Sequence, residues 1–225
     1  MPTGLLAVDA HMSDRTPKIG FFGGTFDPIH HGHLILASYA VSGAGLDRLL
    51  FAPAADPPHK DRRVSPVSDR IEMLLRAIDP DPRFEMTTVD LDREGPHYSA
   101  DTLAILAAQN PGAKIYFLMG SDSYRDLPRW HEPMRLFDHA DLLVGLRPKS
   151  TFDEVELARA LPPTRVQTTF VDIPLIEISS TEVRHRVSQA LPIDYLVPHA
   201  VQRYIEANGL YLDAHEVFTN RQIVD

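Results

Sequence analysis

Two glycines that join an apolar run to a histidine-rich segment constrain this chain more than any other feature. The run Ile19–Phe22 leads into Gly23 and Gly24, and the chain continues Thr-Phe-Asp-Pro-Ile-His-His-Gly-His-Leu. This order is typical of a buried strand, a glycine turn and a helix start. His30 and His33 are three positions apart and so share one helix face. Because a helix start has unpaired N–H groups and the positive end of the dipole, the segment predicts a phosphate site with two imidazoles.

Apolar runs alternate with helix-like segments along the rest of the chain. We expect strands at Lys18–Phe22, Arg48–Phe51, Phe84–Val89, Ile115–Met119, Asp141–Gly145 and Val166–Val171. We expect helices at His31–Gly43, Val67–Ile78, Ser99–Gln109 (capped by Ser99), Phe152–Leu161, Thr181–Gln189 and Ala200–Ala207. This alternation predicts an α/β fold: a Rossmann-like, doubly wound parallel sheet with helices on both faces, in a single domain. The domain should cover residues 17–212, between a loosely ordered extension at 1–16 and a polar tail at 213–225.

Composition limits the partners of the chain. A net charge of −9 over 225 residues argues against nucleic-acid or membrane partners, so a phosphate ligand needs a local cationic patch. The absence of cysteine excludes disulfides, thiolate metal sites and a cysteine nucleophile, and it fits a cytoplasmic location. No apolar run approaches the roughly 20 residues that cross a bilayer. The sequence also has no Gly-x-x-x-x-Gly-Lys-Ser/Thr, Gly-x-Ser-x-Gly or His-Glu-x-x-His motif, which disfavours P-loop NTPases, α/β-hydrolases and that class of zinc enzyme.

A second helix start carries an unusual density of hydroxyl groups. Ser179 and Glu182 have the spacing of a capping box, which by itself would only begin a helix. Ser180 and Thr181 add two hydroxyls, and Arg184 follows within about one turn. Such an end can hold an anion through N–H groups, hydroxyls and a guanidinium. Two helix starts of this kind suit one ligand with several phosphates, so we expect them to converge in space.

These two segments resemble the paired motifs of the nucleotidylyltransferase superfamily, His-x-Gly-His and Ile-Ser-Ser-Thr. Further segments resemble nicotinate-nucleotide adenylyltransferases, in order: Pro57-Pro58-His59-Lys60, Tyr98-Ser99-Ala100-Asp101-Thr102-Leu103, Gly120-Ser121-Asp122, Trp130 and Arg147-Pro148. The resemblance implies transfer of the adenylyl group of ATP to nicotinate mononucleotide, giving deamido-NAD and pyrophosphate, with Mg²⁺ bound at the ATP phosphates.

The resemblance also implies roles for individual residues. His30, His33 and Arg184 would be catalytic, with His33 the main donor to the transition state. The ATP-binding residues would be Gly23, Gly24, Thr25, His30, His33, Gly120, Asp122, Ser179, Ser180, Thr181 and Arg184. The acceptor would be bound by His59 and Lys60 at its phosphate, by Trp130 stacked on the pyridine ring, and by the Tyr98–Ser99 turn at the ring carboxylate. His131 departs from the family pattern, because another aromatic residue is expected after the tryptophan.

Other functions remain open at the level of sequence. The acceptor could be nicotinamide mononucleotide or another phosphorylated molecule. A metal-dependent phosphohydrolase could use Asp27, His30, His31 and His33 as ligands. A third hypothesis is a nucleotide sensor without turnover. The sequence also leaves open whether the chain forms a homo-oligomer.

Overall fold

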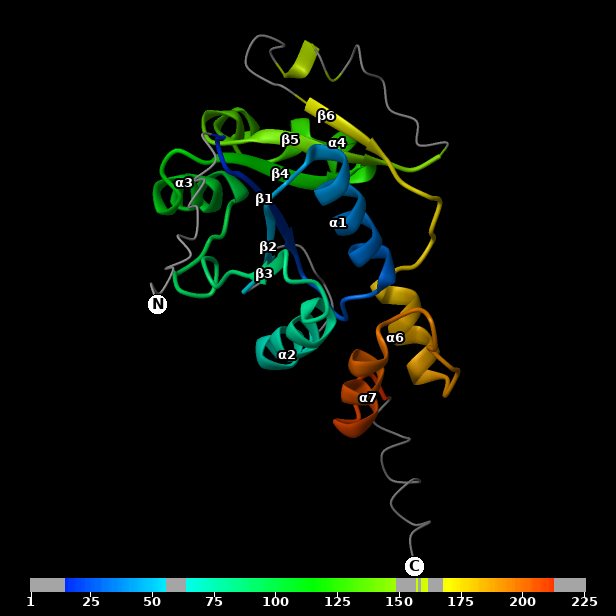
Figure 1. The fold of residues 1–225 in the computed structure, drawn as a ribbon. Coiled ribbons are helices and arrows are strands. Elements are labelled where there is room, and N and C mark those ends of the chain that lie inside the picture. The colour runs from blue at the N-terminus through cyan, green and yellow to red at the C-terminus, as the bar shows by residue number, and fades with distance from the viewer. Residues whose placement is uncertain (1–14, 56–63, 149–156, 158, 162–167, 213–225) are drawn as a thin grey trace, which may run out of the picture.

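The computed structural model describes residues 15–55, 64–148, 157, 159–161 and 168–212. Six strands form one parallel sheet in the order β3-β2-β1-β4-β5-β6. The strands are β1 (Lys18–Gly24), β2 (Arg48–Pro53), β3 (Phe84–Met86), β4 (Lys114–Gly120), β5 (Asp141–Leu146) and β6 (Thr168–Asp172). The chain winds outward from β1 to β3 and then crosses to β4 on the other side of β1, as a doubly wound sheet does (Figure 1). The predicted fold class is confirmed.

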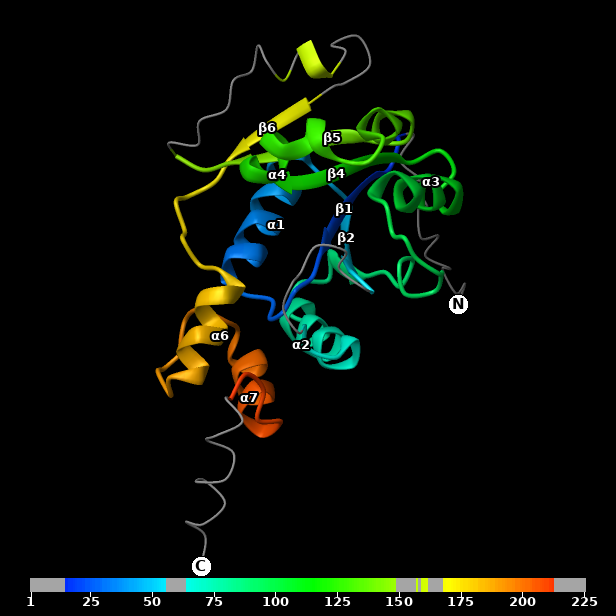
Figure 2. The same ribbon diagram turned by 180° about the vertical axis from the view of Figure 1, so that it is seen from behind.

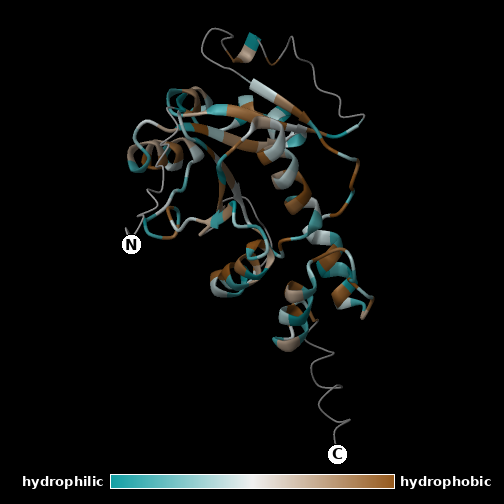
Figure 3. Ribbon diagram, viewed as in Figure 1, coloured by the Kyte–Doolittle hydropathy of each residue, from teal (hydrophilic) through white to brown (hydrophobic). Residues whose placement is uncertain are grey.

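Helices cover both faces of this sheet because the strands are apolar on both faces. The helices are α1 (His31–Ala44), α2 (Val67–Ile78), α3 (Ser99–Gln109), α4 (Ser121–Asp126), α6 (Ser180–Ser188) and α7 (His199–Ala207), with short 3₁₀ turns η1 (Leu127–Arg129) and η2 (Pro133–Asp138). Phe22 belongs to the core under α1, α2, α6 and α7, whereas its neighbour Phe21 belongs to the core under α3, η1 and η2. Figure 2 shows the molecule from behind, with the α3 side of the sheet toward the viewer. Figure 3 shows hydrophobic residues along the strands.

Several expected elements differ in detail. β3 ends at Met86 instead of Val89, because it pairs with β2 only as far as Phe51 and the chain then turns away. α3 has the predicted bounds, but its N-cap is Tyr98 and not Ser99, and no side chain caps it. Most of the helix expected at Phe152–Leu161, the extension at 1–14 and the tail at 213–225 lie outside the described residues. Within the described part of the chain, no helix has both the length and the apolarity that a membrane span requires.

Candidate active site

The turn Gly24–Pro28, which we call the phosphate turn after its predicted role, begins at the last residue of β1, at the edge of the sheet where the winding reverses. β1 is paired with β2 on one side and β4 on the other, so the carboxyl ends of these central strands lie together. Ligands of open α/β sheets collect at this crevice. α1 begins directly after the phosphate turn, with His30 as its N-cap in an extended conformation. The sheet therefore brings the first predicted motif to the expected edge.

The imidazoles of His30 and His33 stack at the start of α1. Their ring centroids are 3.7 Å apart and the rings are inclined by 23°. The backbone N–H of His30 donates a hydrogen bond to Nδ1 of His33, at 3.3 Å. A ring nitrogen that accepts a hydrogen bond carries no proton, so this contact assigns the ring proton of His33 to Nε2. His33 is thereby prepared as a hydrogen-bond donor through Nε2.

His30 is buried and is held in its neutral form. Only 5% of its surface is exposed. Burial, with smaller effects from the charges of Arg147 and His31, lowers the pKa of His30 from 6.5 to about 4. Gly32 makes this packing possible, since a Cβ at position 32 would lie 3.0 Å from both Cε1 and Nδ1 of His30. The imidazole of His30 thus supports that of His33 by packing, and His30 carries no charge near pH 7.

The second motif docks onto the phosphate turn, although more than 150 residues separate them. Ser180 Oγ donates to the carbonyl of Pro28 at 2.9 Å. Arg184 Nη1 donates to the carbonyl of Asp27 at 2.5 Å, and its Nη2 donates to Thr181 Oγ1 at 3.0 Å. The starts of α1 and α6 therefore lie side by side, as expected (Figure 1).

The predicted N-cap of α6 is confirmed at Ser179. Ser179 is the N-cap, and its hydroxyl accepts a hydrogen bond from the N–H of Glu182 at 3.1 Å. The hydroxyls of Ser179, Ser180 and Thr181 each have a protein contact in this arrangement. These hydroxyls help to build the start of α6. The backbone N–H groups in the first turn of α6 are the groups suited to bind an anion.

Asp27 connects the phosphate turn to the C-terminal part of the domain. Its carboxylate is 1% exposed and accepts hydrogen bonds from the Tyr211 hydroxyl at 2.8 Å and the Ser65 N–H at 3.4 Å. Burial alone would raise the pKa of Asp27, but the hydrogen bonds from Ser65 and Tyr211 and the charge of Arg184 outweigh it and hold the pKa below its usual 3.8. The carboxylate is therefore a buried anchor within the site.

A buried arginine supports the other side of the phosphate turn. Arg70 of α2 is 1% exposed, and its guanidinium donates to the carbonyls of Thr25, Ala55 and Ser65 at 2.9, 3.3 and 3.2 Å. The sequence predicts no role for Arg70, Ser65 or Tyr211. No local motif marks them, because each contacts a segment that is distant in sequence.

The predicted adenosine-binding residues lie at the end of β4. Gly120 precedes α4 as its N-cap, and a Cβ there would have no neighbour within 4 Å, so the backbone is accessible. The side chain of Asp122 is 66% exposed and lies 3.4 Å from Arg125 and 3.8 Å from Arg147. An exposed carboxylate beside this crevice is suited to a ribose hydroxyl.

The predicted pyridine-binding residues come together from two segments. The ring of Tyr98, at the start of α3, stacks on His131 with centroids 4.0 Å apart. Trp130 is half-buried next to η1 and packs toward Phe117, with centroids 6.1 Å apart. His131, which departs from the family pattern, thus takes an aromatic role against Tyr98. His59 and Lys60 lie outside the described residues.

Comparisons with known proteins show what this chain is similar to. A family model described as cytidylyltransferase-like matches residues 21–186. The probable nicotinate-nucleotide adenylyltransferase of Thermomicrobium roseum is 44% identical over 195 residues, covering 86% of this chain and 91% of that protein. The nicotinate-nucleotide adenylyltransferase of Bacillus subtilis is 38% identical over 195 residues, covering 86% and 98%.

A solved structure shows the same fold. The nicotinic acid mononucleotide adenylyltransferase of Plasmodium falciparum, complexed with NaAD, has a TM-score of 0.71 at 21% identity and covers 87% of this chain and 97% of its own. This match shows the fold, and the family model and the sequence relatives establish the family. The chain belongs to the cytidylyltransferase-like family and, within it, to the nicotinate-nucleotide adenylyltransferases.

Proposed function

We propose that this chain transfers the adenylyl group of ATP to nicotinate mononucleotide, giving deamido-NAD and pyrophosphate in NAD biosynthesis. The observation that carries the proposal is the meeting of two helix starts, those of α1 and α6, at the edge where the sheet winding reverses. The relatives named for this activity, and the solved relatives complexed with NaAD and with APC, support it.

The proposed reaction is an in-line displacement at phosphorus. An anionic oxygen of the mononucleotide phosphate forms a bond to the α-phosphorus of ATP, and the bond from that phosphorus to the bridging oxygen of the leaving pyrophosphate breaks. Because the attacking oxygen is already anionic, no strong general base is required. Alignment and neutralisation of the leaving charge supply the rate enhancement, and positioning alone is worth roughly 7–11 kcal/mol in well-aligned cases.

The site residues divide this work. His33 donates through Nε2 to the phosphate oxygens where negative charge develops, while neutral His30 keeps the imidazole of His33 in place. Backbone N–H groups of the phosphate turn and of the α6 start bind the remaining phosphate oxygens. Arg184 adds a cationic guanidinium beside the phosphate turn.

Mg²⁺ is proposed to enter with ATP. It would supply charge neutralisation at the phosphates. Within the described parts of the chain, no group of three or more His, Cys, Asp and Glu side chains is placed to hold a metal ion. The carboxylate of Asp27 already accepts bonds from Tyr211 and Ser65. The N–H groups, the Nε2–H of His33 and the guanidinium of Arg184 are hydrogen-bond donors, which bind phosphate oxygens and not a cation. Mg²⁺ would therefore be held mainly by substrate oxygens, which is how it is often bound.

The acceptor is proposed to bind beside α3. Trp130 would stack on the pyridine ring, the backbone N–H groups at Tyr98 and Ser99 would contact the ring carboxylate, and His59 and Lys60 would neutralise the mononucleotide phosphate. Asp122 would contact a ribose hydroxyl of ATP. We propose that the enzyme works on free nucleotides in the cytoplasm, without a nucleic-acid or membrane partner.

A direct assay tests the proposal. Purified protein is incubated with ATP, Mg²⁺ and either nicotinate or nicotinamide mononucleotide, and dinucleotide and pyrophosphate are measured by chromatography. We expect much faster turnover with the acid, because the amide lacks the charge that N–H groups would recognise. Equal rates would refute the carboxylate site, and phosphate release without an acceptor would favour a phosphohydrolase.

A pair of histidine variants tests the catalytic assignment. His33→Ala should bind ATP but form almost no pyrophosphate, which also separates an enzyme from a nucleotide sensor. His199→Ala is the matched control, because His199 also lies in the first turn of a helix but belongs to α7 and is exposed. Unchanged turnover in His33→Ala would remove this residue from the mechanism.

A further inference from the structure

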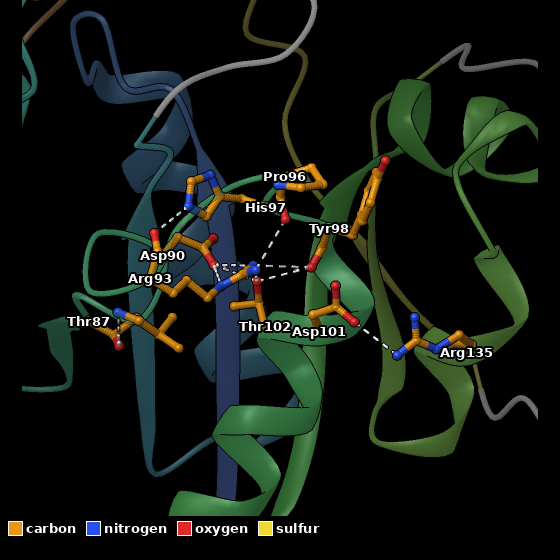
Figure 4. A network of polar contacts seen from close by, with 10 residues as sticks. Thr87, Asp90, Arg93, Pro96, His97, Tyr98, Asp101, Thr102 and Arg135 are labelled. Carbon is orange, nitrogen blue, oxygen red and sulfur yellow. Dashed lines mark hydrogen bonds and ion pairs between the residues drawn. The ribbon is translucent and has the colours of Figure 1, made fainter.

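A buried polar network lies between β3 and α3, outside the phosphate site (Figure 4). It is formed by Asp90, which is 9% exposed, by Thr102 of α3, which is fully buried, and by Arg93, whose side chain is partly buried at 20% exposure. Burying a carboxylate and a guanidinium costs free energy unless they are paired and hydrogen-bonded. No step of the proposed reaction uses these three side chains, so their arrangement calls for another explanation.

The three side chains satisfy one another closely. Thr102 Oγ1 donates to Asp90 Oδ1 at 2.6 Å, and Arg93 Nη2 donates to the same carboxylate oxygen at 2.9 Å. Arg93 Nε approaches that oxygen at 3.3 Å, and Nη2 also lies 3.0 Å from the hydroxyl of Thr102. The network therefore fixes the direction of the Arg93 guanidinium relative to α3.

The guanidinium also holds the backbone that leads into α3. Arg93 Nη1 donates to the carbonyl of Pro96 at 3.3 Å, and Nη2 contacts the carbonyl of Tyr98 at 3.5 Å. The ring Nε2 of His97 lies 3.0 Å from the carbonyl of Arg93, a contact within the loop that leads into α3. Since no side chain caps α3, this arginine and its partners are what shape the start of the helix.

The same helix start is tied to the tryptophan segment. Asp101, in the first turn of α3, accepts a hydrogen bond from Arg135 of η2 at 2.9 Å. Tyr98 stacks on His131, the residue after Trp130. The position of the Tyr98–Ser99 backbone relative to Trp130 therefore depends on contacts at both ends, with Arg93 on one side and η2 on the other.

We infer that Arg93, held by Asp90 and Thr102, is a positioning residue for the nicotinate ring: it sets where the N–H groups at the start of α3 meet the ring carboxylate. The inference rests on the proposed function. A planar fork that bonds two carbonyls, a hydroxyl and a carboxylate cannot be replaced by the single ammonium of lysine. Small displacements of a positioning group change recognition strongly, because the N–H groups must meet the carboxylate at hydrogen-bond distance.

The variant Arg93→Lys tests the inference by steady-state kinetics with each substrate varied in turn. We expect the KM for nicotinate mononucleotide to rise about tenfold or more and the KM for ATP to change less than about twofold. The preference for acid over amide should fall by a similar factor. The control is Arg83→Lys, because Arg83 makes a similar fork to Asp81, at 3.0 and 2.7 Å, before β3 and on the surface. It should leave both KM values unchanged.

A second variant covers the case in which Arg93→Lys does not fold. Thr102→Val keeps the shape of the side chain but removes the hydroxyl between Asp90 and Arg93. It should raise the KM for the mononucleotide selectively. A joint rise in both KM values, or no change in either, would overturn the inference. Failure of the wild-type protein to use nicotinate mononucleotide would instead refute the proposed function, which the same assay reports separately.

Discussion

Removing the hydroxyl of Tyr211 should destabilise the protein far more than removing that of a similar tyrosine nearby. The Tyr211 hydroxyl donates to the carboxylate of Asp27 at 2.8 Å, and this carboxylate is 1% exposed. In Tyr211→Phe the charged group stays buried with one donor fewer. Losing a hydrogen bond to a buried charge costs about 1.5–3 kcal/mol. For a domain of this size, that corresponds to a fall in Tm of roughly 3–12 °C.

Tyr204 provides the matched control. Its hydroxyl also donates to an aspartate, Asp69, at 2.8 Å, and it also joins the C-terminal part of the chain to an earlier segment. Asp69 is only partly buried, so water can replace the lost donor. Tyr204→Phe should therefore cost less than about 1 kcal/mol.

Urea unfolding followed by circular dichroism measures both variants, and a double-mutant cycle with Asp27→Asn isolates the pair. We expect the effects of Tyr211→Phe and Asp27→Asn to be strongly non-additive, with a coupling of at least about 1 kcal/mol. Equal destabilisation by the two tyrosine variants, or additive effects in the cycle, would show that Asp27 does not depend on this hydroxyl.

Three further outcomes are expected. The pKa of His30 is about 4 in the folded state and near 6.5 when unfolded, so the unfolded chain takes up its proton first as the pH falls. Stability should therefore fall between about pH 6.5 and pH 4, and the loss between pH 7 and pH 5 should be about 2 kcal/mol smaller in His30→Asn, measured by urea unfolding. Gly32→Ala should displace the His30 ring, because the new methyl group would lie 3.0 Å from it, and kcat should fall at least about tenfold without loss of Tm, since alanine favours helix. Chelation with EDTA should abolish turnover and added Mg²⁺ should restore it, while the thermal stability of the protein without nucleotide stays unchanged.

The fold could be predicted from sequence where local pattern and burial agree. β1 and β4 are buried on both faces and therefore appear as continuous apolar runs, and α2 shows clear helical spacing. β3 was predicted too long, because Val89 is buried but packs on the α3 side of the sheet after the chain has turned. The short elements α4, η1 and η2 were not predicted, since six residues or fewer are too short to show a period.

The candidate site could be predicted only where its residues belong to a local motif. His30 and His33 mark a helix start by their spacing, and so does the hydroxyl-rich segment around Ser180. Arg70 gave no signal, because a single arginine on an amphipathic helix normally faces water; here three backbone carbonyls surround it. Tyr211 gave none either, since its partner lies 184 residues earlier in the chain.

That long reach has a consequence for protein synthesis. The ribosome makes Asp27 early and Tyr211 184 residues later, so a nascent chain lacks the donor that its buried carboxylate needs for most of translation. Strands β1 to β6 can already be complete at that stage, whereas the phosphate turn still lacks its contact with Tyr211. Stable packing of the phosphate turn should therefore arise only after Tyr211 has left the exit tunnel.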